Sequence, residues 1–293
     1  MKISTSTRLS TSSWRWWSLG ILVIGIIQPL FVMSLSAAPS EQIKVNPDSL
    51  KQAEKLITAS GIEVQINQIP AALIQAGRQQ AGPAASFIQP LMQSMQNVFV
   101  PDEMIDTLSN ELVTRLDVPT MLDALKWYQS ENGQTIVNAH KAMLKPDMME
   151  KVAKAMTNPT PDISDQRQSL LEAIASSTQS TDIALETMVN IQAAFMTALS
   201  NMISPDNAQS FDQLRDAFGN SKQKMRGQFA EQLLLQQAVL LEPLPDSTLQ
   251  EFLQFADSGS GKKFFSALNG ALDETLQIYA RRLPLAVKGG VSK

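Results

Sequence analysis

The chain has no cysteine and one histidine among its 293 residues. The lack of cysteine excludes disulfides, thiolate metal sites and a lipid-modified N-terminal cysteine. A single histidine, His140, excludes metal sites that need several imidazole ligands. We therefore expect no metal and no cofactor, and we interpret His140 as a structural residue rather than a catalytic one.

Clusters of positive charge are also missing. The chain has 24 Lys and Arg against 28 Asp and Glu, a formal net charge of −4, and its basic residues form no run. Nucleic acids and anionic membrane surfaces both require clustered cations. The sequence therefore predicts no nucleic-acid partner, and membrane association only through the N-terminus.

The sequence has no run of alternating apolar and polar residues that would predict a strand. It is rich in Ala, Gln, Leu and Met, which favour helix. Apolar residues recur with helical spacing along most of the chain, as at Leu50, Ala53 and Ile57. The sequence therefore predicts an all-α protein.

The N-terminus has the layout of an export signal. Lys2, Arg8 and Arg15 precede an apolar run over 19–35, and small residues follow at 36–38. We predict a signal peptide over 1–38, or, as an alternative, an uncleaved anchor helix. Cleavage would move the formal charge to about −7, since it removes cations and no acids. The predicted location is periplasmic or secreted, or else anchored in the inner membrane facing the periplasm.

The rest of the chain divides at residues 157–165, which hold two prolines and no apolar periodicity. We predict a tail over 39–46, a first helical repeat over 47–157, a linker over 158–165, a second repeat over 166–285 and a C-terminal tail over 286–293. Each repeat should hold about five or six helices. Within them, we expect one helix to run from Ser130 to about residue 156, a long one to be capped by Thr181 or Asp182, another to stop at Gly219 and the last to close near Pro284.

The division into repeats depends on a short pattern that occurs twice, 128 residues apart. In each copy an aromatic residue ends an apolar helical stripe, a Ser follows three residues later and a Gly three residues after that. The Ser can cap the next helix, and the Gly lets the preceding helix cross closely. This structural repeat motif comprises Trp127, Tyr128, Ser130, Gly133 and Gln134 in the first copy, and Phe255, Ser258, Gly261 and Lys262 in the second.

This motif resembles the domain-of-unknown-function family numbered 2059, whose members typically read Phe-Tyr-x-Ser-x-x-Gly followed by Lys or Gln. The first copy is the better match, because Ala256 replaces the Tyr in the second. The resemblance covers about ten residues per copy. It implies a compact, all-α, exported bacterial protein, and it carries over no catalytic residue.

Other candidate sites have simpler interpretations. Residues 258–263 combine Ser, Gly and Lys but lack the P-loop spacing, so phosphate binding at that helix start is the less favoured reading. There is no G-x-S-x-G nucleophile elbow. The acidic pairs Asp102/Glu103, Asp147/Glu150 and Asp273/Glu274 could serve a hydrolase, but they lie near predicted helix termini or on polar faces, where solvated carboxylates are common. The methionines could bind Cu(I), but Met92 and Met95 lie on a predicted core stripe, and an adaptable Met-lined partner surface is the better alternative.

These observations favour a non-enzymatic interaction or scaffold module of the cell envelope, with an envelope protein as the expected partner. Two alternatives remain open at the level of sequence. One is a carrier that holds an apolar ligand between the two halves. The other is a hydrolase that uses dispersed carboxylates.

Overall fold

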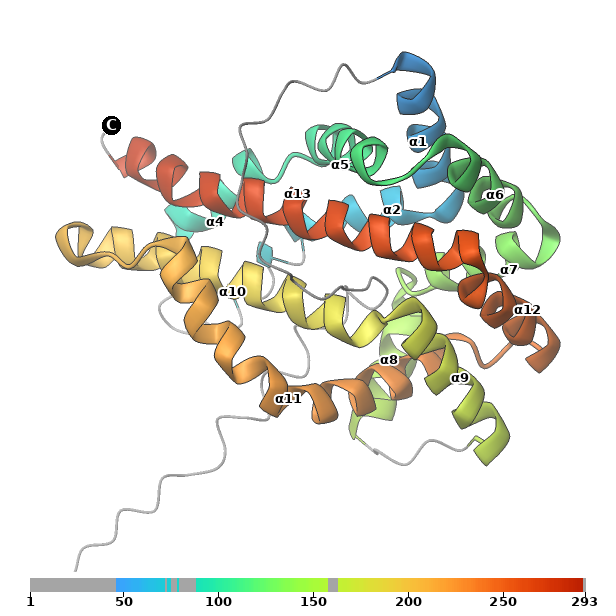
Figure 1. The fold of residues 1–293 in the computed structure, drawn as a ribbon. Coiled ribbons are helices and arrows are strands. Elements are labelled where there is room, and N and C mark those ends of the chain that lie inside the picture. Colours follow the sequence, from blue (N-terminus) through green and yellow to red (C-terminus); the bar gives the residue numbers. More distant parts are fainter. Residues whose placement is uncertain (1–45, 72, 75–77, 79–87, 158–162, 292–293) are drawn as a thin grey trace, which may run out of the picture.

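The computed structural model describes residues 46–71, 73–74, 78, 88–157 and 163–291. The predicted leader, most of the predicted tail over 39–46 and residues 158–162 of the predicted linker lie outside this set. Within the described residues every regular element is a helix (Figure 1), which confirms the predicted all-α class.

The helices fall on either side of the predicted linker. Before it lie α1 (Pro47–Ser60), α2 (Ile62–Ile66), α4 (Gln89–Val98), α5 (Pro101–Arg115), α6 (Val118–Tyr128), α7 (Glu131–Ala142) and α8 (Pro146–Thr157). After it lie α9 (Asp165–Thr178), α10 (Ser180–Ile203), the 3₁₀ turn η3 (Pro205–Asn207), α11 (Phe211–Leu240), α12 (Asp246–Asp257) and α13 (Gly259–Val291).

Two long helices form the centre of the array. α10 and α13 run side by side, and α13 also packs against α4, α5 and α6 (Figure 1). α1 packs against α5 and α6, whereas α9 packs against α11 and α12. One continuous apolar core includes residues from both sides of the linker, for example Leu56, Leu112, Leu171 and Phe264. The two sides are therefore held together by shared packing.

α10 is the most apolar of the long helices. By length and composition alone it could cross a membrane, and 61% of its apolar 18-residue window is buried inside the protein. Burial on that scale is what the core helix of a folded array requires, because apolar side chains are stabilised by removal from water.

The structure corrects one predicted helix boundary before the linker and one after it. The helix that follows Ser130 ends at Ala142, and α8 begins separately at Pro146. Proline disfavours helical backbone at the residue before it and lacks an N–H, so the chain turns there. α10 begins at Ser180 after Gln179, a residue in the left-handed region at φ 52°, rather than being capped by Thr181 or Asp182.

Two further helices run past their predicted ends. α11 continues through Gly219 to Leu240. α13 continues through Pro284 to Val291, so the predicted boundary at 285 and the tail that follows it are wrong for residues 286–291. Leu283 and Val287 are almost fully buried on either side of this proline. Their burial favours a continued helix despite the hydrogen bond that proline removes.

Candidate functional site

The two copies of the motif form two helix–turn–helix junctions with the same local geometry. Ser130 and Ser258 have nearly identical backbone angles, φ −68° and ψ 164° against φ −65° and ψ 162°. The Ser130 hydroxyl accepts from the Gly133 N–H at 3.1 Å and donates to the Trp127 carbonyl at 2.6 Å. The Ser258 hydroxyl accepts from the Gly261 N–H at 2.9 Å and donates to the Phe255 carbonyl at 2.7 Å. Each Ser therefore closes the preceding helix and caps the next.

The glycine of each junction lies against backbone. A Cβ on Gly133 would approach the Trp127 carbonyl and lie 2.8 Å from the Tyr128 Cα. A Cβ on Gly261 would approach the Phe255 carbonyl oxygen and lie 2.8 Å from its carbonyl carbon. Neither position has room for a side chain, so glycine is required by close approach of the two helices.

The last motif position is used differently in the two copies. The Gln134 amide donates to the Tyr128 carbonyl at 2.6 Å and thus adds a bond within the first junction. Lys262 instead lies 3.3 Å from the Asp257 carboxylate in an exposed ion pair. Exposed pairs of this kind contribute about 0–1 kcal/mol, so Gln134 is the better-supported structural residue of the two.

The two junctions pack directly against each other. The Trp127 ring stacks on Phe255, with centroids 4.5 Å apart and an interplanar angle of 7°. Tyr128 meets Phe255 and Phe264 edge to face, at 5.8 Å and 5.6 Å. Offset and edge-to-face ring pairs are the favoured aromatic geometries. An aromatic cluster therefore joins α6 to α12 and α13.

The polar contacts around this cluster are reciprocal. Asn132 donates to Glu251 at 2.6 Å, and Ser260 donates to Asp123 at 2.7 Å. Ser260 and Glu251 lie 128 positions after Asn132 and Asp123, the same offset that separates the two motif copies. Reciprocal contact between matching residues is the pattern of a two-fold contact. The two junctions therefore face each other as a pseudo-symmetric pair.

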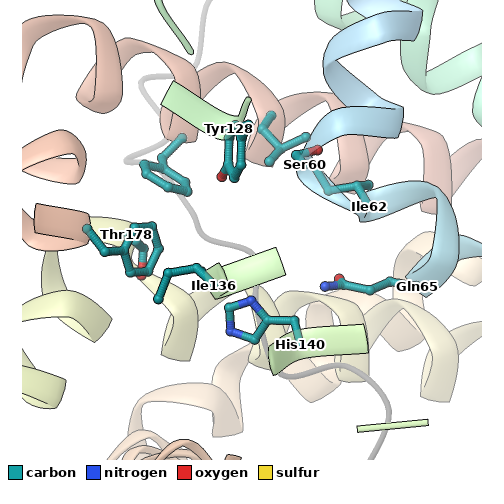
Figure 2. A pocket seen from close by; sticks show the side chains of 10 residues that line it. Ser60, Ile62, Gln65, Tyr128, Ile136, His140 and Thr178 are labelled. Carbon is teal, nitrogen blue, oxygen red and sulfur yellow. The ribbon is translucent and has the colours of Figure 1, made fainter. Parts of the chain in front are cut away.

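A small cavity lies beneath the paired junctions. Its volume is about 20 Å³. Figure 2 shows Ser60, Gln65, Tyr128, His140 and Thr178 converging on it. The apolar part of its wall is formed by Ile62, Ile136, Phe252, Phe265 and Leu268.

The size and electrostatics of this cavity limit its chemistry. A cavity needs about 10–15 Å³ to hold one water, whereas small-molecule sites measure about 300–1,000 Å³. Burial lowers the pKa of His140 to about 4 and raises that of Tyr128, so both groups are neutral near pH 7. A general base works best with a pKa near the working pH. The cavity therefore fits a buried water better than a substrate.

A second hollow is larger but open. It has a volume of about 740 Å³, and it is lined by Asn67, Pro70, Ala71, Ile74, Arg78, Gln96, Phe99 and Pro101. Ligand sites in proteins typically bury about 70–90% of the surface of a small molecule. An open hollow on the surface does not provide that enclosure.

The residues considered for phosphate binding are already engaged. The Ser258 hydroxyl accepts a hydrogen bond from the Gly261 N–H, and Ser260 donates one to Asp123. The side chain of Lys263 lies 3.5 Å from Asp117. Carboxylates thus surround the start of α13, and they would repel an incoming anion.

Members of the acidic pairs considered for a hydrolase form ion pairs and hydrogen bonds with neighbouring side chains. Glu103, in the first turn of α5, lies 3.8 Å from Arg282, and Glu150 pairs with Lys154 at 2.8 Å. Asp273 accepts from Asn190 at 2.7 Å and from Gln277 at 2.8 Å. Among the described residues, no group of three or more His, Asp and Glu is arranged to hold a metal ion. Met92 and Met95 are buried in the core, as their stripe predicts, while Met149 is exposed.

Sequence reasoning missed a polar network in the middle of α10. Asn190 is 1% exposed, donates to Asp273 on α13 and accepts from Arg215 on α11 at 2.8 Å. A signal for it was available, since Asp182, Glu186 and Asn190 recur every four residues on an otherwise apolar helix. That spacing predicts one polar stripe.

Comparison of the chain with protein-family models, with curated proteins and with solved structures finds no match.

Proposed function

We propose that this chain is an exported, non-enzymatic interaction or scaffold module of the cell envelope, in which the paired junctions hold two related helical halves together. The observation that supports it best is that the motif residues are engaged in contacts within the two junctions. Both serine hydroxyls are occupied by hydrogen bonds to backbone groups, both glycines lie against backbone, and the aromatic rings stack on one another. The most specific pattern in the sequence therefore builds a rigid joint.

The relation between the halves is supported by a second pair of helices. α1 and α9 each have 14 residues, and a side chain at the N-cap, Asn46 or Ser164, accepts from the helix backbone. Both end in a left-handed residue, Gly61 at φ 79° and Gln179 at φ 52°. In each half this helix packs against the helix that leads into the motif turn, α6 or α12. A shared helical unit accounts for all of these similarities.

Export is inferred from the charged, apolar and small-residue segments of residues 1–38. A rigid module without a substrate-sized cavity at its joint is suited to holding partners in the envelope. The carrier alternative would require the halves to separate, because the joint encloses only about 20 Å³. The hydrolase alternative would require a carboxylate to leave its present partners.

The test is affinity capture of the full-length protein from a mildly cross-linked envelope fraction of its own host, followed by mass spectrometry of proteins, lipids and the mature N-terminus. The Gly261→Ala variant, which should disturb the joint, is compared with Gly259→Ala, where an added Cβ meets nothing within 4 Å. We expect one reproducible protein partner that Gly259→Ala retains and Gly261→Ala loses at a temperature where both are folded. Lipid without a protein partner would support the carrier instead. The absence of both a protein partner and lipid would contradict the proposal.

A further inference from the structure

The middle of α11 has no buried residue. Phe211 and Leu214 anchor its start in the core, and the next buried residue is Phe229. Residues 215–228, which we call the strap, are partly or fully exposed throughout, and their apolar contacts with the two cores are made by the partly buried Phe218 and Met225. Helices in proteins depend mainly on tertiary packing for stability. The strap is therefore attached firmly at both ends and weakly between them.

The strap is held to α10 by a ladder of polar contacts. Arg226 donates to both carboxylate oxygens of Asp182 through one edge of its guanidinium, with Nε 2.7 Å from Oδ1, and Lys222 pairs with Glu186. Arg215 donates to Asn190 at 2.8 Å. The acceptors on α10 are spaced four residues apart, so they lie on one helix face.

Arg215 also faces two carboxylates. Its guanidinium lies 3.8 Å from Glu186 and 3.6 Å from Asp273. The charged side chains of the ladder are between 22% and 46% exposed, so salt can reach them. Salt at about 1 M weakens such contacts, since the Debye length falls there to about 3 Å, which is close to the separation of these charges.

The strap also carries two glycines that packing does not explain. A Cβ on Gly219 or Gly227 would meet nothing within 4 Å. Glycine inside a helix is less favourable than alanine, because it has more backbone freedom to lose. Figure 1 shows α11 bending along its length. Glycines in open space therefore mark the strap as the part of α11 in which helix is easiest to break.

We propose that the strap is a salt-gated cover: residues 215–228 release from α10 as a unit while both ends of α11 stay attached. Release uncovers the polar stripe of Asp182, Glu186 and Asn190. It also opens one side of a small apolar cluster that is separate from the main core and consists of Ala184, Leu185, Phe229 and Leu233, with Met188 and Met225 packed against it. Release of the strap thus responds to ionic strength. This inference is independent of the proposed function.

The test is hydrogen–deuterium exchange of the full chain, read by mass spectrometry at low salt and at about 1 M NaCl. We expect peptides from 215–228 to exchange about ten-fold faster at high salt, since three screened contacts are lost together. Peptides from 229–240 and from α12 should keep their rates. Equal protection of the strap and of 229–240 at both salts would overturn the proposal, and so would faster exchange spread over the whole chain.

Matched variants separate the ladder from general charge effects. Arg226→Gln should speed strap exchange at low salt and reduce its salt dependence. Arg282→Gln is the control, because Arg282 is similarly exposed but pairs with Glu103 on α5. The double variant Gly219→Ala with Gly227→Ala should slow strap exchange. No difference between Arg226→Gln and Arg282→Gln would refute the proposal that the ladder holds the strap on α10.

Discussion

Replacing Gly261 by alanine is the most direct test of how the paired junctions are built. The added Cβ would lie 2.8 Å from the Phe255 carbonyl carbon and 3.0 Å from the Ala256 Cα. Ordinary contacts of this kind begin at 3.4 Å. Because the obstacles are backbone atoms of α12, no side chain can turn aside to relieve the clash. α12 must therefore move away from α13, which disturbs the stack of Trp127 on Phe255.

The expected size of the effect follows from two opposed terms. Overpacking of a well-packed core costs about 1–3 kcal/mol, and a backbone obstacle belongs at the upper end of that range. Alanine is more favourable than glycine inside a helix by about 1 kcal/mol. We therefore expect Gly261→Ala to lower the free energy of unfolding by about 2 kcal/mol. For a chain of this size that corresponds to a fall in Tm of about 4–8 °C.

The assay is urea and thermal unfolding followed by circular dichroism. Gly259→Ala is the matched control, because it lies in the same turn of α13 and its Cβ would meet nothing within 4 Å. We expect that control to equal or slightly exceed the wild type in stability. A Gly261→Ala protein that is as stable as Gly259→Ala would refute the close-approach argument.

Three further results are expected. Ser258→Ala should lower the free energy of unfolding by about 1 kcal/mol through loss of the cap, measured by a thermal melt, and an unchanged melt would count against the cap. A double-mutant cycle of Trp127→Leu and Phe255→Leu in urea should give a coupling of about 0.5–1.5 kcal/mol, and additive effects would show that the stack adds nothing beyond burial. Burial lowers the pKa of His140 to about 4, so the unfolded chain binds the proton first and stability falls as pH drops from about 6.5 to about 4. His140→Gln should remove up to about 3 kcal/mol of that loss in urea titrations at the two ends of this range, and an unchanged pH profile would show that the imidazole is solvated in the folded state.

The class of fold could be predicted from the sequence because helices depend on local patterns. The start of α5 at Pro101 and the end of α1 at Gly61 follow from proline and glycine chemistry that acts within a few residues. The errors arose where tertiary contacts override those local signals. α11 passes through Gly219 because its ends are anchored in cores and its middle pairs with α10, and α13 passes through Pro284 because Leu283 and Val287 are buried.

The candidate site was predictable in part. A Ser three residues before a Gly at a helix start implies a cap and a close crossing, and both are present at Ser130 and Ser258. The cavity beneath them was not predictable. Ser60, His140 and Thr178 lie far apart in sequence, and none belongs to a pattern that would associate it with the others.

The sequence by itself determined that the chain forms helices, where most of them begin, and that the same turn occurs twice, because hydrogen bonding and capping act between near neighbours. Only the tertiary structure decided that the two turns face each other, with Trp127 stacked on Phe255 and Asn132 and Ser260 exchanging matching hydrogen bonds. It also decided that a polar ladder fastens α11 to α10. These arrangements depend on which helix faces bury the most apolar surface together, and that is a property of the whole chain rather than of any short segment.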